Sequence, residues 1–473
     1  MKVVIVNFTG QRENWGSQAT SWELHAYLRR ILQPLGLTEL SVVPFPPGHL
    51  LDTWVQWKHG HRIRQILSNR QPSPDDLDFL EQLCAVRFGK LLARVKDADI
   101  VLFQGEGSMG AGSFLENVRL FALPYLAKHK WRKIVIALNL SVDAASRSDL
   151  ELSCGLLSDF DLVVLREARS HAVCLDLGLA DALLVPDMAF RSTTGARLSS
   201  IDLGASLPVT SESYFCISGS AGLQNYDLEA FAGTCRQVSV NLGLRAVFMY
   251  SRMRDYSLAS ALGKTFPRDD ILFVTRNSHP RFEQMLPVLR NARFLLGGRY
   301  HTAISALTQR TPIILTSANS QKNEGIGALL GIEMPVRNYG DREALIADAH
   351  NVHDRNATLR EDIHRAVCRL DAIYDAFATV LAGIVRGKAA KEALHPVSHI
   401  LAPTPNNLPT ADANFKRPTK GLRLKRMRIR NAFASADLDR AIKQAMVPLS
   451  LRQNLEIYDA EPWTAAQIAR TGH

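Results

Sequence analysis

The sequence has no closely spaced cysteines and no long apolar run. Its six cysteines are scattered over 473 residues without a CxxC pair or zinc-type spacing, so neither a disulfide framework nor a metal site is indicated. No stretch approaches the roughly 20 apolar residues that span a bilayer. The apolar run near the N-terminus, at residues 3–6, is too short for the core of a signal peptide. We therefore expect a reduced, cytoplasmic protein without a resident metal or cofactor.

The net charge of +10 is concentrated in one segment near the C-terminal end. Residues 416–430 contain no acid and eight basic side chains, namely Lys416, Arg417, Lys420, Arg423, Lys425, Arg426, Arg428 and Arg430. No aromatic residues interleave with these charges to stack on bases, so we expect no nucleic-acid partner. An anionic membrane surface is one expected partner, which would hold the protein peripherally at the inner face of the membrane. A solvated charge run is the alternative.

Apolar runs and helical patterns alternate along most of the chain. Runs rich in Val, Ile and Leu that lack alternation are typical of strands buried on both faces of a parallel sheet. They occur at 3–6, 40–45, 99–104, 133–138, 162–165 and 182–185, and again near 214–219, 245–251, 271–275, 293–297 and 312–316. Helical patterns occur at about 17–35, 75–96, 113–129, 167–178, 227–242, 281–291, 301–309 and 356–386. The fold class indicated is α/β.

A chain of this length exceeds what one hydrophobic core usually supports, so we expect two domains. Residues 1–190 and 214–345 each read as an open α/β domain, and the small polar residues of 191–213 read as a linker between them. A helical segment at 346–395 is expected to pack back across the first domain. Residues 396–473 read as a proline-containing linker and a basic tail. Two such domains in tandem place a cleft between them.

The stretch GGRYHTAISALTQRTPIIL, at 297–315, carries the strongest functional signal. A strand ending in Gly297 and Gly298 delivers Arg299 and His301 to the start of a helix. A helix start offers unpaired backbone N–H groups and a partial positive charge, so the two side chains and the helix can hold an anion together. We expect ligand contact here, and a structural histidine is the alternative.

Polar side chains also follow other predicted strands, where open α/β sheets bind ligands. Arg166 and Ser170 follow the run at 162–165, and Asp187 follows the run at 182–185. Asn14 and Ser17 lie in a polar loop after the first strand, where they line the cleft or merely cap the next helix. Lys322, after the last of these strands, either completes an anion site or is solvated.

GEGSMG at 105–110 matches the GxGxxG spacing of dinucleotide-binding loops through Gly105, Gly107 and Gly110. However, it follows the third candidate strand rather than the first, and the next strand ends in Asn139 rather than an acid. A tight turn that brings the backbone close to some ligand is the preferred interpretation. The other alternative is that the glycines only form a turn.

Taken in order, these motifs resemble those of the polysaccharide pyruvyl transferase family over roughly residues 1–345. The matching stretches are NWGSQAT (14–20), QGEGSMG (104–110), VLREARS (164–170), VPDMAF (185–190) and GGRYHTAISALTQRTPII (297–314). Two positions depart from the family pattern, because Ser17 replaces an aspartate and Glu106 interrupts a glycine run. The resemblance implies a GT-B-like architecture, in which two Rossmann-like domains face each other across a cleft.

The resemblance also implies a reaction. Members of this family transfer the pyruvyl group of phosphoenolpyruvate to sugar hydroxyls as a ketal and release phosphate, so the expected partners are phosphoenolpyruvate and a surface glycan or its lipid-linked precursor. His301 and Arg299 are then the expected catalytic residues, in a cationic cradle for the departing phosphate, with His301 as general acid. The remaining candidates for substrate binding are Arg166 and Lys322 on the donor, Asn14, Gly16, Ser17 and Gly105 on the acceptor side, and Ser170 and Asp187.

Two other functions stay open at this stage. A GT-B glycosyltransferase that uses a nucleotide sugar would hold a diphosphate with the same Arg299 and His301. A non-catalytic glycan-binding relative is the second alternative, suggested by Ser17.

Overall fold

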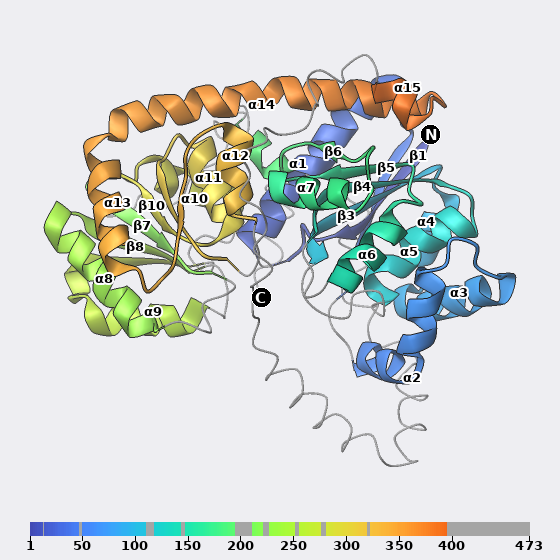
Figure 1. The fold of residues 1–473 in the computed structure, drawn as a ribbon, viewed down its shortest axis with the longest axis horizontal. Coiled ribbons are helices and arrows are strands. Elements are labelled where there is room, and N and C mark those ends of the chain that lie inside the picture. Colours follow the sequence, from blue (N-terminus) through green and yellow to red (C-terminus); the bar gives the residue numbers. More distant parts are fainter. Residues whose placement is uncertain are drawn as a thin grey trace, which may run out of the picture.

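The computed structural model describes residues 1–12, 14–46, 50–109, 118–142, 147–193, 211–220, 227–250, 255–275, 281–318 and 322–394. The predicted linker at 191–213 falls largely outside this part of the chain, and the basic tail falls wholly outside it. The described residues form two parallel β-sheets with flanking helices, and one long helix runs along both (Figure 1). The predicted α/β class is confirmed.

The first sheet has the strand order β2-β1-β3-β4-β5-β6, and every pair in it is parallel. Its strands are β1 (Lys2–Phe8), β2 (Glu39–Pro44), β3 (Ile100–Met109), β4 (Ile134–Val142), β5 (Leu162–Leu165) and β6 (Leu183–Leu184). The helices of this half are α1 (Trp15–Leu32), α2 (Leu50–Leu67), α3 (Pro74–Phe88), α4 (Leu91–Asp97), α5 (Val118–His129), α6 (Arg147–Leu157) and α7 (Ala168–Asp176). A 3₁₀ segment, η2 (Met188–Thr193), follows β6.

The second sheet has the order β12-β11-β10-β7-β8-β9 and is also parallel throughout. Its strands are β7 (Tyr214–Ser218), β8 (Arg245–Tyr250), β9 (Ile271–Thr275), β10 (Leu295–Gly297), β11 (Ile313–Thr316) and β12 (Val336–Arg337). Its helices are α8 (Leu228–Leu242), α9 (Tyr256–Thr265), α10 (Phe282–Arg290), α11 (Tyr300–Thr308), α12 (Glu324–Leu330) and α13 (Arg342–Asp354). Two helices complete the described chain, α14 (Asn356–Val385) and α15 (Ala390–Leu394).

Strand β1 shows why the apolar runs do not alternate with polar residues. Val3 and Ile5 belong to one hydrophobic core, whereas Val4 and Val6 belong to another on the opposite face of the sheet. Both faces are covered by helices, so neither face of the strand tolerates a charge. Burial on both faces therefore explains why the strands appear in the sequence as continuous apolar runs.

The strand orders define one switch point in each sheet, where the direction of winding reverses. In the first sheet it lies between β1 and β3, and in the second it lies between β7 and β10. Ligands of open α/β sheets bind outside the carboxyl ends of the strands at such points. The fold therefore offers two candidate ligand crevices.

Helix α14 joins the two halves along one side of the molecule (Figure 1). The hydroxyl of Tyr27, on α1, donates to the carbonyl oxygen of Tyr374 at 2.6 Å, and the Tyr27 ring stacks on Phe377. Side chains from both sheets and from α14 belong to one hydrophobic core. Helix α14 thus packs against both halves at once.

The helix pattern predicted over 75–96 is two helices. Ser73 caps α3 by accepting from the amide of Asp76 at 3.2 Å, and Pro74 occupies the first position. Gly89, with φ of 53° and ψ of −128°, then ends α3, and the chain starts again as α4. A glycine adopts this backbone conformation without strain, and the single long helix was therefore the wrong prediction.

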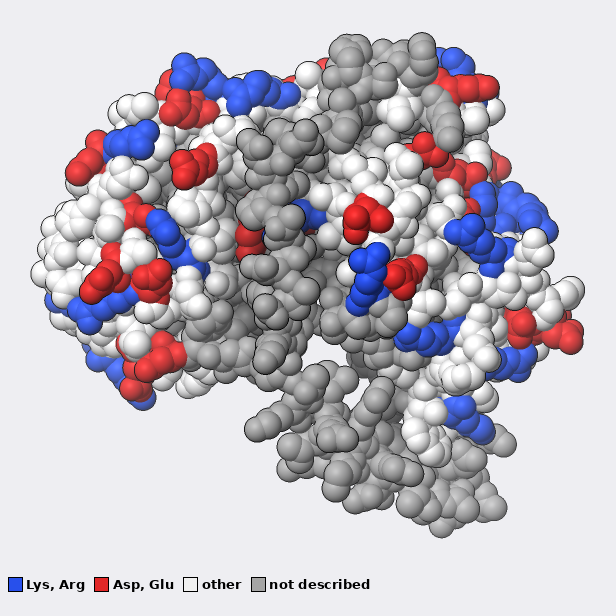
Figure 2. Space-filling model, viewed as in Figure 1, with Lys and Arg blue, Asp and Glu red and all other residues white. Residues whose placement is uncertain are grey.

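Acidic and basic side chains intermix on the face of the molecule shown in Figure 2, without a broad area of one sign among the described residues. Among the same residues, no helix has both the length and the apolar character that a membrane crossing requires.

Candidate functional site

Three of the predicted site residues meet where the two halves of the molecule touch. Arg166 follows β5, Asp187 follows β6, and His301 lies in the first turn of α11. Nη1 of Arg166 lies 2.8 Å from Oδ2 of Asp187, and Nε2 of His301 lies 3.3 Å from the same carboxylate oxygen. Two strand ends of the first sheet and a helix start of the second thus build one cluster.

His301 has two competing partners for one nitrogen. Its Nε2 lies 3.3 Å from Asp187 Oδ2 and also 3.3 Å from Arg166 Nη1. A guanidinium can only donate a hydrogen bond and an ionised carboxylate can only accept one. A proton on Nε2 therefore selects Asp187, and loss of that proton selects Arg166. The geometry lets this imidazole release and regain a proton while keeping a partner.

Asp187 is fully buried and is held by four donors or cations. Its Oδ1 accepts from Thr20 Oγ1 at 2.7 Å and from the amide of Ala189 at 2.9 Å, while Arg166 and His301 face Oδ2. Burial alone would favour the neutral acid, but the charges of Arg166 and His301 outweigh it and keep the pKa of the Asp187 carboxyl below its usual range. Asp187 is therefore a fixed negative charge.

Arg166 is buried and surrounded by ordered groups. Its Nε donates to Ser141 Oγ at 2.8 Å, and its guanidinium lies 4.9 Å from the centre of the Tyr300 ring. Burial lowers the pKa of this guanidinium and the carboxylate of Asp187 raises it, with a net increase. The Tyr300 hydroxyl is buried and has no hydrogen-bond partner among the described residues. Lys322 approaches the same ring, with its ammonium 6.0 Å from the centre.

Arg299 lies one residue before α11 and forms an ion pair with the buried Asp255. The Arg299 side chain is only 12% exposed. Its position depends on Gly297, which has φ of 154° and leaves no room for a side chain beside the Ser218 carbonyl. The close approach of β10 to β7 at the second switch point thus requires glycine.

The start of α1 reaches the cluster through Gly16. Asn14 caps the helix by accepting from the amide of Gly16 at 3.2 Å, and its Nδ2 donates to Ser17 Oγ at 3.1 Å. A Cβ added to Gly16 would lie 2.5 Å from both Cβ and Nδ1 of His301. The start of α1 therefore packs directly on the imidazole, and Ser17 is buried next to it.

Gly105 and Ser170 support the strands instead of joining the cluster. Gly105 lies within β3, not in a turn before a helix, and its missing side chain makes room for Leu140. Ser170 Oγ accepts from the amide of Val142 at 2.8 Å, which ties α7 to β4. The strand also includes Gly107, so the GxGxxG match is not the loop of a dinucleotide site, and Gly110 lies outside the described residues.

Glu167, beside Arg166, caps α7 and touches the second half of the molecule. Its carboxylate accepts from the amides of Arg169 at 2.8 Å and Ser170 at 3.0 Å. A Cβ on Gly325, in α12, would lie 2.5 Å from Glu167 Oε2. Burial raises the pKa of Glu167 to about 7, against the opposing effect of these hydrogen bonds and of Arg166.

The structure adds polar residues that the sequence analysis missed. Thr9 and Gln104 bind the carboxylate of Glu106, and Thr20 holds Asp187. Gln104 and Thr20 lie in the stretches QGEGSMG and NWGSQAT, but the pattern predicted no role for them, and Thr9 lies in no motif. Glu106 was visible in the sequence only as a departure from the glycine run.

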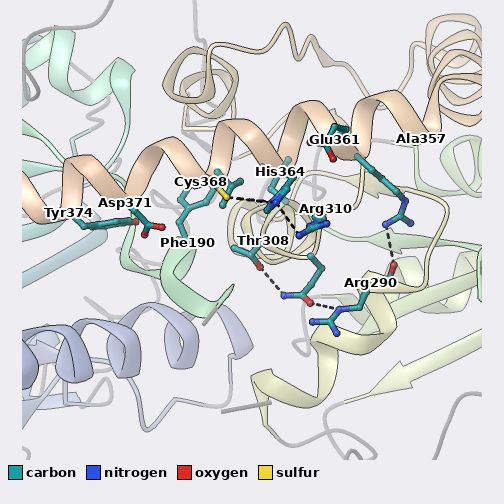
Figure 3. Close-up of a pocket in the computed structure, with 14 residues that line it drawn as sticks. Phe190, Arg290, Thr308, Arg310, Ala357, Glu361, His364, Cys368, Asp371 and Tyr374 are labelled. Carbon is teal, nitrogen blue, oxygen red and sulfur yellow. Dashed lines mark hydrogen bonds between the residues drawn. The ribbon is translucent and has the colours of Figure 1, made fainter. Parts of the chain in front are cut away.

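A cavity of about 660 Å³ lies beside this cluster, between α14 and the end of α11 (Figure 3). Its lining includes Phe190, Arg310, His364 and Tyr374, and none of the predicted site residues. The Tyr374 hydroxyl donates to the carbonyl oxygen of Asp187 at 2.9 Å, so Tyr374 connects the cavity wall to the cluster. Among the described residues, no group of three or more His, Cys, Asp or Glu is arranged to hold a metal ion.

The two parallel sheets, with a polar cluster at the strand ends between them, define a GT-B-like fold. MnaA from S. aureus, solved with UDP, has a TM-score of 0.50 at 12% identity and covers 81% of this chain and 97% of that chain. UDP-GlcNAc 2-epimerase from Neisseria meningitidis, bound to UDP-GlcNAc, has a TM-score of 0.48 at 9% identity and covers 77% of this chain and 94% of that chain. Alr3699/HepE from Anabaena, in complex with UDP-glucose, has a TM-score of 0.46 at 12% identity and covers 85% of this chain and 99% of that chain. At 12% identity the likeness to MnaA concerns the fold alone.

A sequence model of the polysaccharide pyruvyl transferases matches residues 27–320, which is more than half of the chain. The chain belongs to the polysaccharide pyruvyl transferase family, a family of transferases. The matched region contains Arg166, Asp187 and His301, and it begins after the Asn14 loop. No curated protein matches the sequence.

Proposed function

We propose that the protein transfers the pyruvyl group of phosphoenolpyruvate to two hydroxyls of a sugar, in a surface glycan or its lipid-linked precursor, and releases phosphate. The observation that carries this proposal is the cluster of Arg166, Asp187 and His301, which joins the two halves of a family member. Phosphoenolpyruvate carries a carboxylate and a phosphate, and the cluster supplies cations from both halves. The family membership supports this donor among the possible phosphates.

The donor would bind at the second switch point. There the start of α11 contributes backbone N–H groups, and Arg299, His301 and Lys322 contribute charge. Arg299 and Arg166 each pair with one carboxylate, which leaves further N–H groups of each guanidinium to hold the donor. Asp255 and Asp187 would thus orient these two cations, because each is buried beside its arginine.

The chemistry requires a proton at the methylene carbon of the donor while a sugar hydroxyl attacks the adjacent carbon. His301 is the proposed general acid, since its Nε2 can exchange Asp187 for Arg166 as it loses the proton. Attack by the second hydroxyl then closes the ketal and expels phosphate into the cationic cradle. Asn14, Gly16 and Ser17 would lie on the acceptor side of His301, and Ser170 and Gly105 would support the site.

A first experiment separates the proposed donor from the alternatives. A ligand that binds only the folded state raises the melting temperature, so phosphoenolpyruvate and nucleotide sugars are compared by thermal shift. Stabilisation by nucleotide sugars alone would favour the glycosyltransferase alternative. Phosphate release from phosphoenolpyruvate is then measured with glycan extracts of the source cell, and no release with any acceptor would favour a non-catalytic glycan-binding protein.

A substitution tests the role of His301. His301→Ala should lower phosphate release by at least about 100-fold, because general acid catalysis contributes roughly that much, while the melting temperature stays near that of the wild type. The side chain is only part-buried, so its loss leaves the core intact. Turnover like that of the wild type would remove His301 from the mechanism.

We further propose that residues 416–430 hold the enzyme at an anionic membrane surface, where lipid-linked acceptors lie. These residues are outside the described part of the chain, so the proposal depends on their eight basic side chains alone. Each basic residue near an anionic bilayer contributes about 1 kcal/mol to binding.

A further inference from the structure

Glu106 is an acid in an unusual backbone position. It lies in β3 with φ of 44°, in the left-handed region that side chains other than glycine rarely adopt, and it is 7% exposed. Thr9 Oγ1 and Gln104 Nε2, the latter at 2.8 Å, donate to the same oxygen, Oε1. No described residue donates to the other oxygen, Oε2. The carboxylate is therefore anchored through one oxygen only.

The position of Glu106 coincides with the switch point of the first sheet. Thr9 follows β1, so the bond between Thr9 and Glu106 bridges the carboxyl ends of β1 and β3, where the winding of the sheet reverses. Asn7, at the end of β1, is also left-handed, with φ of 62°, and its Nδ2 donates to the Gln104 carbonyl. Strained residues of this kind persist where the surrounding structure holds them and are concentrated at functional sites.

Two guanidiniums lie within electrostatic range of Glu106. Its charge acts on Arg12, whose guanidinium packs 4.5 Å from the centre of the Phe45 ring, and on Arg166 of the central cluster. Neither arginine forms an ion pair with Glu106 among the described residues. Gly107, the next residue, would bring a Cβ within 3.5 Å of Arg166 Nη2. The Glu106 carboxylate thus lies next to the cluster, and among the described residues it is not paired with a cation.

We propose that Glu106 is the general base that accepts the proton of the attacking sugar hydroxyl, with the acceptor bound at the β1/β3 switch point. This inference rests on the proposed function. A carboxylate anchored through Oε1 keeps the lone pairs of Oε2 for the hydroxyl. The donor at the β7/β10 switch point and the acceptor at the β1/β3 switch point would then face each other across the cluster.

The protons balance over the two steps. In the first step, the hydroxyl oxygen bonds to the central carbon of phosphoenolpyruvate, the hydroxyl proton passes to Glu106, and the π electrons take a proton from His301 at the methylene carbon. In the second step, the second hydroxyl gives its proton to His301 as its oxygen displaces phosphate, and protonated Glu106 returns its proton to the departing phosphate. Two hydroxyl protons end as one methyl hydrogen and one proton on phosphate, and both side chains are regenerated.

Three variants test the proposal. Glu106→Gln keeps the size and the Oε1 acceptor but removes the base. Glu106→Gly removes the side chain and suits the left-handed backbone, so its melting temperature should equal or exceed that of the wild type. Thr9→Val is the matched control, because it breaks the anchor but keeps the carboxylate.

Phosphate release in the presence of an active glycan acceptor is the readout. We expect turnover to fall about 100-fold or more in Glu106→Gln and Glu106→Gly, with phosphoenolpyruvate binding by calorimetry unchanged, and formate to restore part of the activity of Glu106→Gly. Turnover of Thr9→Val should fall by less than about tenfold. The role of Glu106, but not the proposed function, would be overturned if turnover of Glu106→Gln stayed within threefold of the wild type. Equal losses of turnover in Glu106→Gln and Thr9→Val, without rescue of Glu106→Gly by formate, would have the same meaning. A wild-type enzyme that releases no phosphate would overturn both.

Discussion

The contact between Gly16 and His301 allows a sharp test of the cluster between the two halves. In Gly16→Ala, the new methyl group would lie 2.5 Å from Cβ and Nδ1 of His301, whereas ordinary van der Waals contact begins at 3.4 Å. The imidazole or the start of α1 must therefore move by about 0.9 Å. Nε2 of His301 lies 3.3 Å from both Asp187 and Arg166, so a shift of this size breaks at least one of these contacts.

Misplacement of a reacting group by about 1 Å can cost roughly 100-fold in rate, and overpacking costs about 1–3 kcal/mol of stability. We expect Gly16→Ala to show losses of this order in kcat/KM for phosphate release and in the free energy of unfolding from urea titrations. Gly233→Ala is the control, since a Cβ at that helix position meets nothing within 4 Å and should stabilise the protein by up to about 1 kcal/mol. A Gly16→Ala enzyme with wild-type kcat/KM would refute the reasoning that this glycine sets the position of His301.

Two further outcomes are expected. Burial raises the pKa of Glu167 to about 7, from an ordinary 4.5, so the folded protein binds this proton more tightly than the unfolded chain does. The resulting stability is present below about pH 4.5 and is lost as the pH rises through 7. Glu167→Gln should remove up to about 3 kcal/mol of that pH dependence in urea titrations from pH 4.5 to 8, and parallel curves for the two proteins would contradict it. Deletion of residues 416–430 should reduce co-sedimentation with anionic vesicles, most clearly at low salt, whereas equal binding would exclude anchoring by this segment.

The sequence predicted the strands well because both sheets are buried on two faces. Continuous Val, Ile and Leu runs such as that of β1 suit a strand that is covered on both faces. Helix α2 (Leu50–Leu67) was missed, since Gly60 and several polar residues interrupt its apolar pattern. GEGSMG was misread as a turn because glycines inside a strand and glycines in a loop have the same spacing.

The candidate site was predictable where its residues follow strands. Arg166, Asp187 and His301 were selected for that reason, and parallel strands bring their carboxyl ends to one edge. Asp255 was not predictable as the partner of Arg299, because the two are 44 residues apart in the chain and no local pattern connects them. The anchoring of Glu106 by Thr9 is a similar case, with 97 residues between the partners. Pairings of this kind exist only once the sheet has formed.

Helix α14 has a consequence for how the protein is made. Tyr27 finds its partner Tyr374 only after a further 347 residues have been added to the chain. At synthesis rates of about 5–20 residues per second, the part of α1 around Tyr27 waits roughly 20–70 s for its partners on α14. During that time the nascent first half exposes an apolar surface at which chaperones can act. A ribosome that stalls before residue 356 leaves this surface permanently exposed, because α14 is not made.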